Sequence, residues 1–210
     1  MSAEQIVDPA ASRAKFAREI EQYRAFEGTY RRQGWLLLDA SFPEVFVVFA
    51  APKLKPSAIV AGVVIDFTDY DLRPPSVRFV DPFTREPLKA KDMTFNMMRR
   101  IPTPAGQPGM IMFQGMGMQM PPFQVQHLIQ TNSPEDKPFL CLPGIREYHD
   151  NPAHTGDPWL LHRASGEGSL AFILEKIWTY GVNPIEDYAW QLKVQVLGFQ
   201  PPQDALGLPT

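Results

Sequence analysis

The fold is decided by residues 35–67, WLLLDASFPEVFVVFAAPKLKPSAIVAGVVIDF. This stretch contains three short runs that are rich in Val, Ile, Leu and Phe, and they span Trp35–Asp39, Glu44–Ala50 and Ala58–Phe67. Branched and aromatic residues favour strands, and the prolines between the runs mark turns. The short spacing between the runs predicts that they form an antiparallel meander.

A long helix is predicted before the strands, over about residues 9–33. Asp8 is placed to cap its first turn, and Pro9 suits the first helical position, where a missing N–H costs nothing. Gly34 is expected to end the helix. Five apolar side chains recur at spacings of three and four and form one stripe: Phe16, Ile20, Tyr23, Phe26 and Tyr30.

Three further elements complete the fold class. A fourth strand, Ser76–Val80, is expected after a double proline, and a last strand is expected over Ala189–Phe199. A second helix is predicted over Gly168–Gly181, because its apolar residues again share one face. That face consists of Leu170, Ile173, Leu174, Ile177 and Trp178. An initial helix followed by a run of strands predicts an α+β domain, with a helix packed on an antiparallel sheet.

The segment from about residue 89 to 137 is the least regular, and eight of the nine methionines lie between Met93 and Met120. We expect a loop or hairpin that folds onto the body, and the alternative is an adaptable surface that binds a partner. Gln124–Gln130 is predicted to form a short strand. Arg146–Pro158 is predicted to form a loop, because its prolines and glycine interrupt regular structure.

The composition excludes several classes of protein. The chain has 210 residues, is 44% hydrophobic and has a net charge of −3, so nothing in it favours nucleic acid or anionic membrane. One cysteine excludes an intramolecular disulfide and indicates a reducing compartment. The amino terminus does not resemble a signal peptide, and no stretch approaches the roughly 20 apolar residues of a membrane span. We expect a single domain, residues 1–210, in the cytoplasm.

The candidate chemistry falls in one window of the sequence. Cys141 is the only thiol, and Glu147, His149, His154 and His162 follow it within 21 residues. A loop that gathers cysteine, carboxylate and imidazole beside an apolar strand is typical of a reactive or metal-binding site.

Three interpretations of this window remain open. In the first, Cys141 is a nucleophile whose thiolate is stabilised by a neighbouring histidine. In the second, the thiolate, imidazoles and carboxylate bind Zn²⁺, although the spacing matches no strong zinc pattern. In the third, Cys141 is a small buried residue between Leu140 and Leu142, and the histidines cap turns.

Several motifs resemble those of ubiquitin-conjugating (UBC) enzymes. The run DYDLRPPSVRFVDPF (69–83) is similar to the segment that precedes the active site in that family. FLCLPG (139–144), Trp159 and GSLAFILEKIWTYGVNP (168–184) are similar to the family's cysteine segment, tryptophan and following helix. The resemblance covers about residues 12–185 and implies a UBC-like fold.

The chain departs from that family in two places. The His-Pro-Asn tripeptide is absent, and Val80-Asp81-Pro82-Phe83 stands where it would begin. About 60 residues separate Val80 from Cys141, so the resemblance implies an insertion over about 86–137. A short flexible tail is expected over about 200–210.

The chain is also similar to bacterial proteins defined by a Cys-Glu-His-His set, which occur beside ubiquitin-like proteins and adenylating (activating) enzymes. The resemblance implies that this set is Cys141, Glu147, His149 and either His154 or His162. These proteins are considered metal-binding because of those residue types.

The resemblance implies an enzyme that receives a ubiquitin-like protein from an activating enzyme and carries it as a thioester on Cys141 to an acceptor protein. His149 would act as base or thiolate partner, Glu147 would orient it, and the second histidine, His154 or His162, would stabilise the oxyanion or position the acceptor. No cofactor is needed for this chemistry. The alternatives are a zinc-binding adaptor that uses Cys141, Glu147, His149 and His154, and an inactive UBC-like scaffold.

Overall fold

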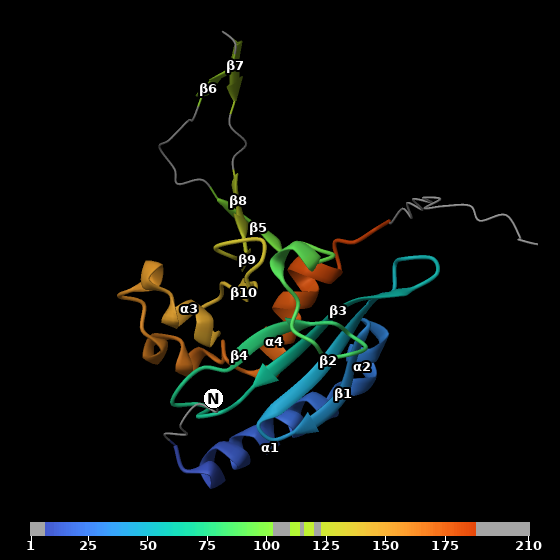
Figure 1. The fold of residues 1–210 in the computed structure, drawn as a ribbon, viewed down its shortest axis with the longest axis vertical. Coiled ribbons are helices and arrows are strands. Elements are labelled where there is room, and N and C mark those ends of the chain that lie inside the picture. Colours follow the sequence, from blue (N-terminus) through green and yellow to red (C-terminus); the bar gives the residue numbers. More distant parts are fainter. Residues whose placement is uncertain (1–6, 103–109, 114–115, 120–122, 188–210) are drawn as a thin grey trace, which may run out of the picture.

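The computed structural model describes residues 7–102, 110–113, 116–119 and 123–187 of the chain. At its centre is a four-stranded antiparallel sheet in the order β1-β2-β3-β4, which confirms the predicted meander (Figure 1). The strands follow one another along the chain: β1 (Trp35–Ser41), β2 (Glu44–Ala51), β3 (Ala58–Asp66) and β4 (Ser76–Val80). Val47 pairs with Val63, and Val63 pairs with Phe79, so these three side chains face one side of the sheet.

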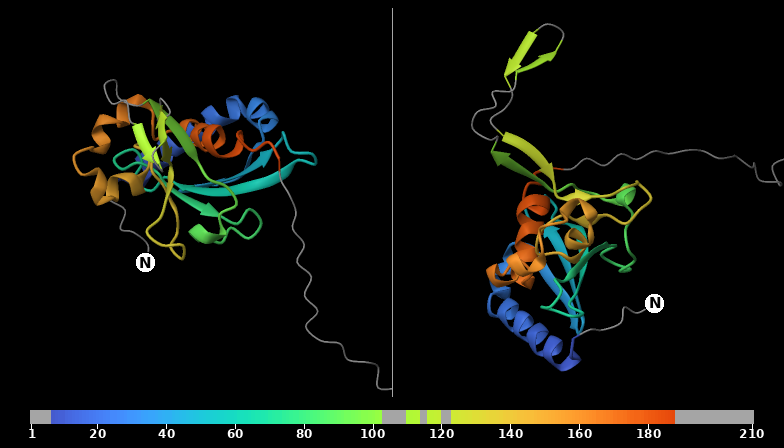
Figure 2. Two further views of the ribbon diagram at one scale, coloured as in Figure 1. Left: turned by 90° about the horizontal axis from the view of Figure 1, so that it is seen from above. Right: turned by 90° about the vertical axis from the view of Figure 1, so that its left-hand side faces the viewer.

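Three helices cover that side of the sheet, as the right-hand view of Figure 2 shows. They are α1 (Pro9–Ala25), α2 (Glu27–Arg32) and α4 (Leu170–Ile177). The predicted face of the last helix is confirmed, because four of its side chains are at most 1% exposed: Leu170, Ile173, Leu174 and Ile177. The chain continues as a π-helical turn, η5 (Trp178–Val182), in which the half-buried Trp178 ring lies 6.2 Å from Trp35. The α+β class is therefore as predicted.

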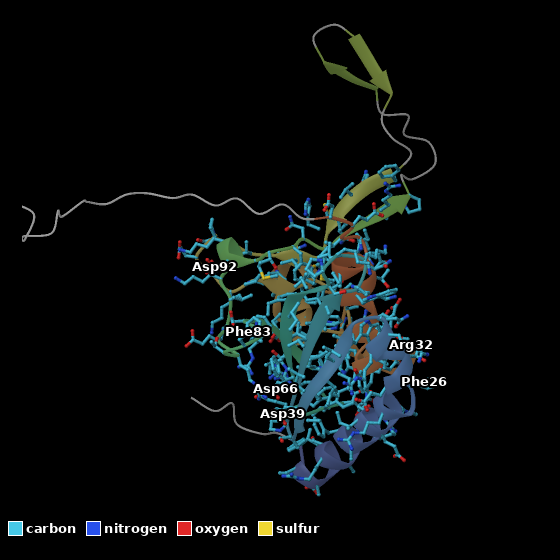
Figure 3. The ribbon with its side chains drawn as sticks, turned by 90° about the vertical axis from the view of Figure 1, so that its right-hand side faces the viewer. Phe26, Arg32, Asp39, Asp66, Phe83 and Asp92 are labelled. Carbon is cyan, nitrogen blue, oxygen red and sulfur yellow. The ribbon has the colours of Figure 1, made fainter. Side chains whose placement is uncertain are left out.

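The opposite face of the sheet has a smaller core formed by Phe46, Val48, Val64 and Val80. The segment after β4 covers it, and the Arg85 guanidinium lies 4.3 Å above the centre of the Phe46 ring. Figure 3 shows Phe83 and Asp92 on this side, opposite Phe26 and Arg32 on the helical side. Asp92 ends the 3₁₀ turn η1 (Ala90–Asp92).

The predicted first helix starts as expected but is not continuous. Asp8 Oδ1 accepts a hydrogen bond from the Ala10 N–H at 2.8 Å, which confirms the cap. The helix is interrupted at Phe26, whose φ and ψ of −116° and 8° are not helical. The break lets Tyr30 stack on Trp35 with ring centroids 4.5 Å apart, and it leaves Phe26 61% exposed. The prediction of one helix with Phe26 in its buried stripe was therefore wrong.

Gly34 separates the second helix from the sheet, as predicted. Its φ is +90°, and a Cβ at this position would lie 2.1 Å from the carbonyl oxygen of Ala50. Its own carbonyl accepts a hydrogen bond from the Ala50 N–H at 2.8 Å. Only glycine suits both the left-handed backbone and this close approach.

A two-stranded ribbon of β5 (Met98–Pro102) and β8 (Phe123–His127) extends away from the sheet (Figure 1). The strand predicted over 124–130 is broken at Leu128, and a second short pair, β9 (Ile129–Gln130) with β10 (Phe139–Leu140), follows it. The single-strand prediction was wrong because the pairing partner changes at Leu128: its N–H donates to the carbonyl of Met97, next to β5, at 2.8 Å, whereas its carbonyl accepts from the Cys141 N–H at 2.7 Å.

The methionine-rich segment forms a hairpin of β6 (Met110–Phe113) and β7 (Met116–Gln119). Figure 1 shows this hairpin beyond the end of the β5–β8 ribbon and away from the sheet. The sequence predicts a loop or a hairpin that folds onto the body. The hairpin is confirmed, but these two strands lie away from the body (Figure 1).

The region predicted as a loop over 146–158 contains α3 (Arg146–Asp150) and the 3₁₀ turn η2 (Pro152–His154). The prediction was wrong for these residues, because Asn151-Pro152 ends one short helical turn and starts the next. Two further 3₁₀ turns, η3 (Trp159–Leu161) and η4 (Arg163–Ser165), lead to α4. The strand expected over 189–199 and the tail over 200–210 lie outside the described residues. In the described ranges no helix is long and apolar enough to cross a membrane.

Candidate active site

Cys141 follows β10 at the base of the β5–β8 ribbon. Its backbone N–H donates to the carbonyl of Leu128 at 2.7 Å, which ties it to the point where the ribbon leaves the body. The residue is only 2% exposed. Burial raises the pKa of the Cys141 thiol, and the positive charge of Arg99 opposes this in part. A proton acceptor close to the sulfur is therefore needed if this thiol is to react near neutral pH.

His154 is the histidine that the structure places against the thiol. Its Nε2 lies 3.3 Å from Cys141 Sγ. The local sequence explains the position, because Pro152 starts the 3₁₀ turn and Asn151 Oδ1 caps it by accepting the Ala153 N–H at 3.0 Å. A ring nitrogen at this distance can exchange a proton with the sulfur.

Tyr148 and Asp157 surround His154, and the sequence analysis identified neither. The Tyr148 ring stacks on the His154 ring with centroids 3.8 Å apart and planes 19° apart. The Tyr148 hydroxyl donates to Asp157 Oδ2 at 2.6 Å. Burial, together with this hydrogen bond, raises the pKa of Tyr148 to about 12, so the hydroxyl remains a donor at neutral pH.

His162 lies behind this pair, between two carboxylates. Its Nε2 is 2.6 Å from Asp157 Oδ1, and its Nδ1 is 2.5 Å from Glu167 Oε2. Burial lowers the pKa of His162, but the two carboxylates outweigh burial and raise that pKa above its usual value. Hydrogen bonds from Tyr148 and His162 in turn lower the pKa of Asp157. The protonated ring can therefore pair with both carboxylates, and no contact joins His162 directly to the sulfur.

The other two predicted residues lie in the same segment but face other partners. Both ring nitrogens of His149 face backbone carbonyls: Nδ1 is 2.9 Å from the oxygen of Asp157, and Nε2 contacts that of Pro143. The Glu147 carboxylate accepts hydrogen bonds from the Ser76 hydroxyl and, at 3.3 Å, from the Val77 N–H. Glu147 therefore attaches α3 to β4, and His149 connects two turns around the site.

These placements do not form a metal centre. The donors of the Cys141, Glu147, His149 and His154 set do not converge, because Glu147 and His149 are directed at partners elsewhere. Across the part of the chain that the structure describes, no three His, Cys, Asp or Glu side chains are grouped so as to hold a metal ion. The arrangement does not fit tetrahedral zinc, which needs three or four ligands around one point.

Long-range contacts hold the segment over 139–168, which contains the site, on the sheet and its helices. The Arg146 side chain donates to the carbonyls of Pro74, at 3.2 Å, and Thr68. Trp159 Nε1 donates to the carbonyl of Asp71 at 2.9 Å, and its ring is 7% exposed. These contacts all reach the connection between β3 and β4.

The family of the chain follows from comparison with known proteins. The model of the Y4jH-like family, which is described as "Y4jH family", matches residues 7–185. This range includes all the site residues described above. The chain belongs to the Y4jH-like family. A relative from Sinorhizobium fredii (strain NBRC 101917 / NGR234), "Uncharacterized protein y4jH", is 54% identical over 202 residues, or 96% of this chain and 97% of the relative.

Part of the missed site carried a signal in the sequence. Asp157 lies in the turn-forming run Gly156-Asp157-Pro158, which was used only to predict a loop. A carboxylate close to three histidines along the chain is a recognisable candidate for pairing with one of them. Tyr148 carried no comparable signal, because its role depends on where the ring stacks.

Proposed function

We propose that this protein is a noncanonical bacterial ubiquitin-conjugating-like enzyme, with a UBC-like fold, that carries a ubiquitin-like protein as a thioester on Cys141. The observation that carries the proposal is the 3.3 Å distance between Cys141 Sγ and His154 Nε2. A single thiol beside an imidazole is the arrangement that nucleophilic catalysis by cysteine requires.

The order of elements supports the same function. A first helix, a four-stranded meander, the cysteine segment, Trp159 and α4 follow one another as they do in the UBC enzymes that the sequence resembles. The His-Pro-Asn tripeptide of those enzymes is absent from this chain. We propose that His154 supplies the chemistry that would otherwise be missing, and this role replaces the one expected for His149.

The proposed loading step is an acyl transfer between sulfur atoms. His154 Nε2 takes the proton of the Cys141 thiol while Sγ attacks the carbonyl carbon of the thioester that joins the ubiquitin-like protein to the activating enzyme. The Sγ–C bond forms, and the thiolate of the activating enzyme leaves and is protonated. In the second step an acceptor amine or hydroxyl attacks the new thioester and releases the Cys141 thiol.

The burial of Cys141 adds a requirement to this proposal. The thiol is 2% exposed, and the Tyr148–His154 stack lies beside it. An incoming carboxyl terminus must reach the sulfur, so other side chains around the thiol have to shift when the partner binds, while the Cys141–His154 contact is kept.

The direct test incubates the protein with ATP, a bacterial ubiquitin-like protein and its adenylating activating enzyme, which are the partners that the resemblance implies. We expect an adduct on a non-reducing gel that disappears when thiol is added. Cys141→Ser should replace it with a thiol-resistant oxyester or abolish it, and His154→Ala should reduce it strongly. His127→Ala is the matched control, because His127 is exposed on β8.

Two other results would each overturn the proposal. If adducts never form although the activating enzyme is loaded, the protein is a scaffold with a UBC-like fold. If stoichiometric zinc is purified with the protein and both Cys141→Ser and His154→Ala melt much lower, the adaptor alternative is correct.

A further inference from the structure

Building on the proposed function, we propose that Tyr148 and Asp157 are positioning residues that hold the His154 imidazole against the Cys141 thiol. Neither side chain is expected to touch the reacting carbonyl. Both act through His154, whose own position determines whether a proton can leave the sulfur.

Few contacts hold the ring of His154. Apart from its 3.3 Å contact with Cys141 Sγ, its stabilising contact is the stack on Tyr148, with centroids 3.8 Å apart. η2 provides only three residues of 3₁₀ helix, so the backbone alone constrains this side chain weakly. A ring stack fixes the plane of the imidazole, and the plane determines whether Nε2 points at the sulfur.

The ring of Tyr148 is in turn held by Asp157. Tyr148 lies in a helix of five residues, α3, and its hydroxyl is held at 2.6 Å by Asp157 Oδ2. The backbone oxygen of Asp157 also lies 2.9 Å from His149 Nδ1. Asp157 therefore connects the turn that follows His154 to α3, the helix that precedes His154.

The second carboxylate oxygen of Asp157 connects it to His162 and Glu167. Its Oδ1 is 2.6 Å from His162 Nε2, and His162 Nδ1 is 2.5 Å from Glu167 Oε2. Glu167 and Gly168 come directly before Ser169, which is the N-cap of α4. This helix packs on the sheet. The connected series Glu167–His162–Asp157–Tyr148–His154 thus runs from the body to the thiol and passes through both positioning residues.

The test measures alkylation of Cys141, the only cysteine, by iodoacetamide across pH 6–10. It needs neither partner protein nor ATP. Tyr148→Phe keeps the ring and removes only the hydroxyl, and Asp157→Ala removes its acceptor. Tyr180→Phe and Asp150→Ala are matched controls, because Tyr180 packs against the core and Asp150 pairs with Arg73 on the surface.

We expect His154→Ala to move the midpoint of the pH profile upward by about one unit and to lower the rate at pH 7 by roughly tenfold. The midpoint and the rate of Tyr148→Phe and of Asp157→Ala should lie between those of wild type and His154→Ala. The two control variants should match wild type. A double variant, Tyr148→Phe with His154→Ala, should react as His154→Ala alone does, since the hydroxyl acts through the imidazole.

Three results separate this inference from the proposed function. If Tyr148→Phe and Asp157→Ala keep the wild-type profile while His154→Ala shifts it, the positioning role is wrong and the catalytic pair remains. If the double variant loses further reactivity, Tyr148 acts on the thiol by another route and the inference is overturned. If all shifts occur as expected but no thioester forms with the natural partners, the inference is supported and only the proposed function fails.

Discussion

The sheet with its three helices and the segment over 139–168 are stabilised in different ways. In the sheet and α4, buried apolar side chains recur at the strand or helix period, and most of them belong to the larger core between the sheet and the helices. The segment contributes Leu140, Leu142 and Ile145 to the same core, but its elements have no more than five residues each, and polar contacts such as those of Arg146 and Asp157 connect them. The comparison teaches that apolar burial stabilises the body and the start of the segment, whereas the turns around the site depend on a few individual hydrogen bonds.

The largest effect is expected in the body. Ile173→Asp would bury a charge without a partner in the α4 face, where Ile173 is 1% exposed. We expect a loss of roughly 3–5 kcal/mol in the free energy of unfolding, which is much of the stability of a small domain. Thermal melting followed by circular dichroism measures it. Ala171→Asp, on the partly exposed side of the same helix, is the control. A normally melting Ile173→Asp variant would show that this face is not part of the core.

The next effect is expected within the segment, where its start meets its end. A Cβ at Gly144 would lie 1.9 Å from the carbonyl oxygen of Glu167, so Gly144→Ala must displace the segment. We expect a loss of about 1–3 kcal/mol and a weaker Cys141–His154 contact, measured as slower alkylation of the thiol. Gly28→Ala in α2 is the control, since the nearest atom is 3.9 Å away and a helical alanine stabilises. Equal stability of the two variants would contradict the tight contact.

The third effect is a dependence on pH. The pKa of His162 is raised in the folded protein by Asp157 and Glu167. Its contribution to stability is therefore fully present below the unfolded pKa of about 6.5 and is lost as pH rises through the folded value. We expect the difference in melting temperature between wild type and His162→Gln to shrink as pH rises above about 6.5. His127→Gln should show no such trend. A constant difference between pH 5.5 and 9 would contradict the charged pairing.

The smallest effect on stability is expected on the surface of α1. Arg13, Arg18 and Arg24 lie on this helix, and Arg13 lies 4.6 Å from the centre of the Phe42 ring. We propose that these charges contact the activating enzyme, as in the UBC enzymes that the sequence resembles. Replacing all three with Glu should slow loading at least tenfold but cost only about 1 kcal/mol of stability. Arg32→Glu on α2 is the control. Unchanged loading of the triple variant would show that the activating enzyme binds another surface.

The same contrast explains how much of the fold could be predicted. The ends of the four strands of the sheet were predicted within one or two residues, because runs of Val, Ile and Phe indicate buried strands in the sequence itself. The α4 face was correct for the same reason. The break at Phe26 could not be predicted, since it depends on Tyr30 reaching Trp35, a contact between separate elements.

The site was predictable only as a set of residue types. Cys141 and four neighbours were selected because they lie close in the sequence, but spacing alone does not distinguish His149 from His154. The choice depends on the direction of each side chain in short turns, where Asn151 and Pro152 determine the backbone. The role expected for Glu147 depended on a contact with His149, and its carboxylate instead faces β4.

The central claim is that Cys141 accepts an acyl group with the help of His154. Intact-mass spectrometry can follow this with a synthetic peptide that ends in a Gly-Gly thioester of mercaptoethanesulfonate, which needs no partner protein. We expect wild type to gain one acyl group that hydroxylamine removes, His154→Ala to gain it at least tenfold more slowly, and Cys141→Ser to show no thioester. Failure of the folded protein to accept the acyl group, or equal rates for wild type and His154→Ala, would contradict the claim.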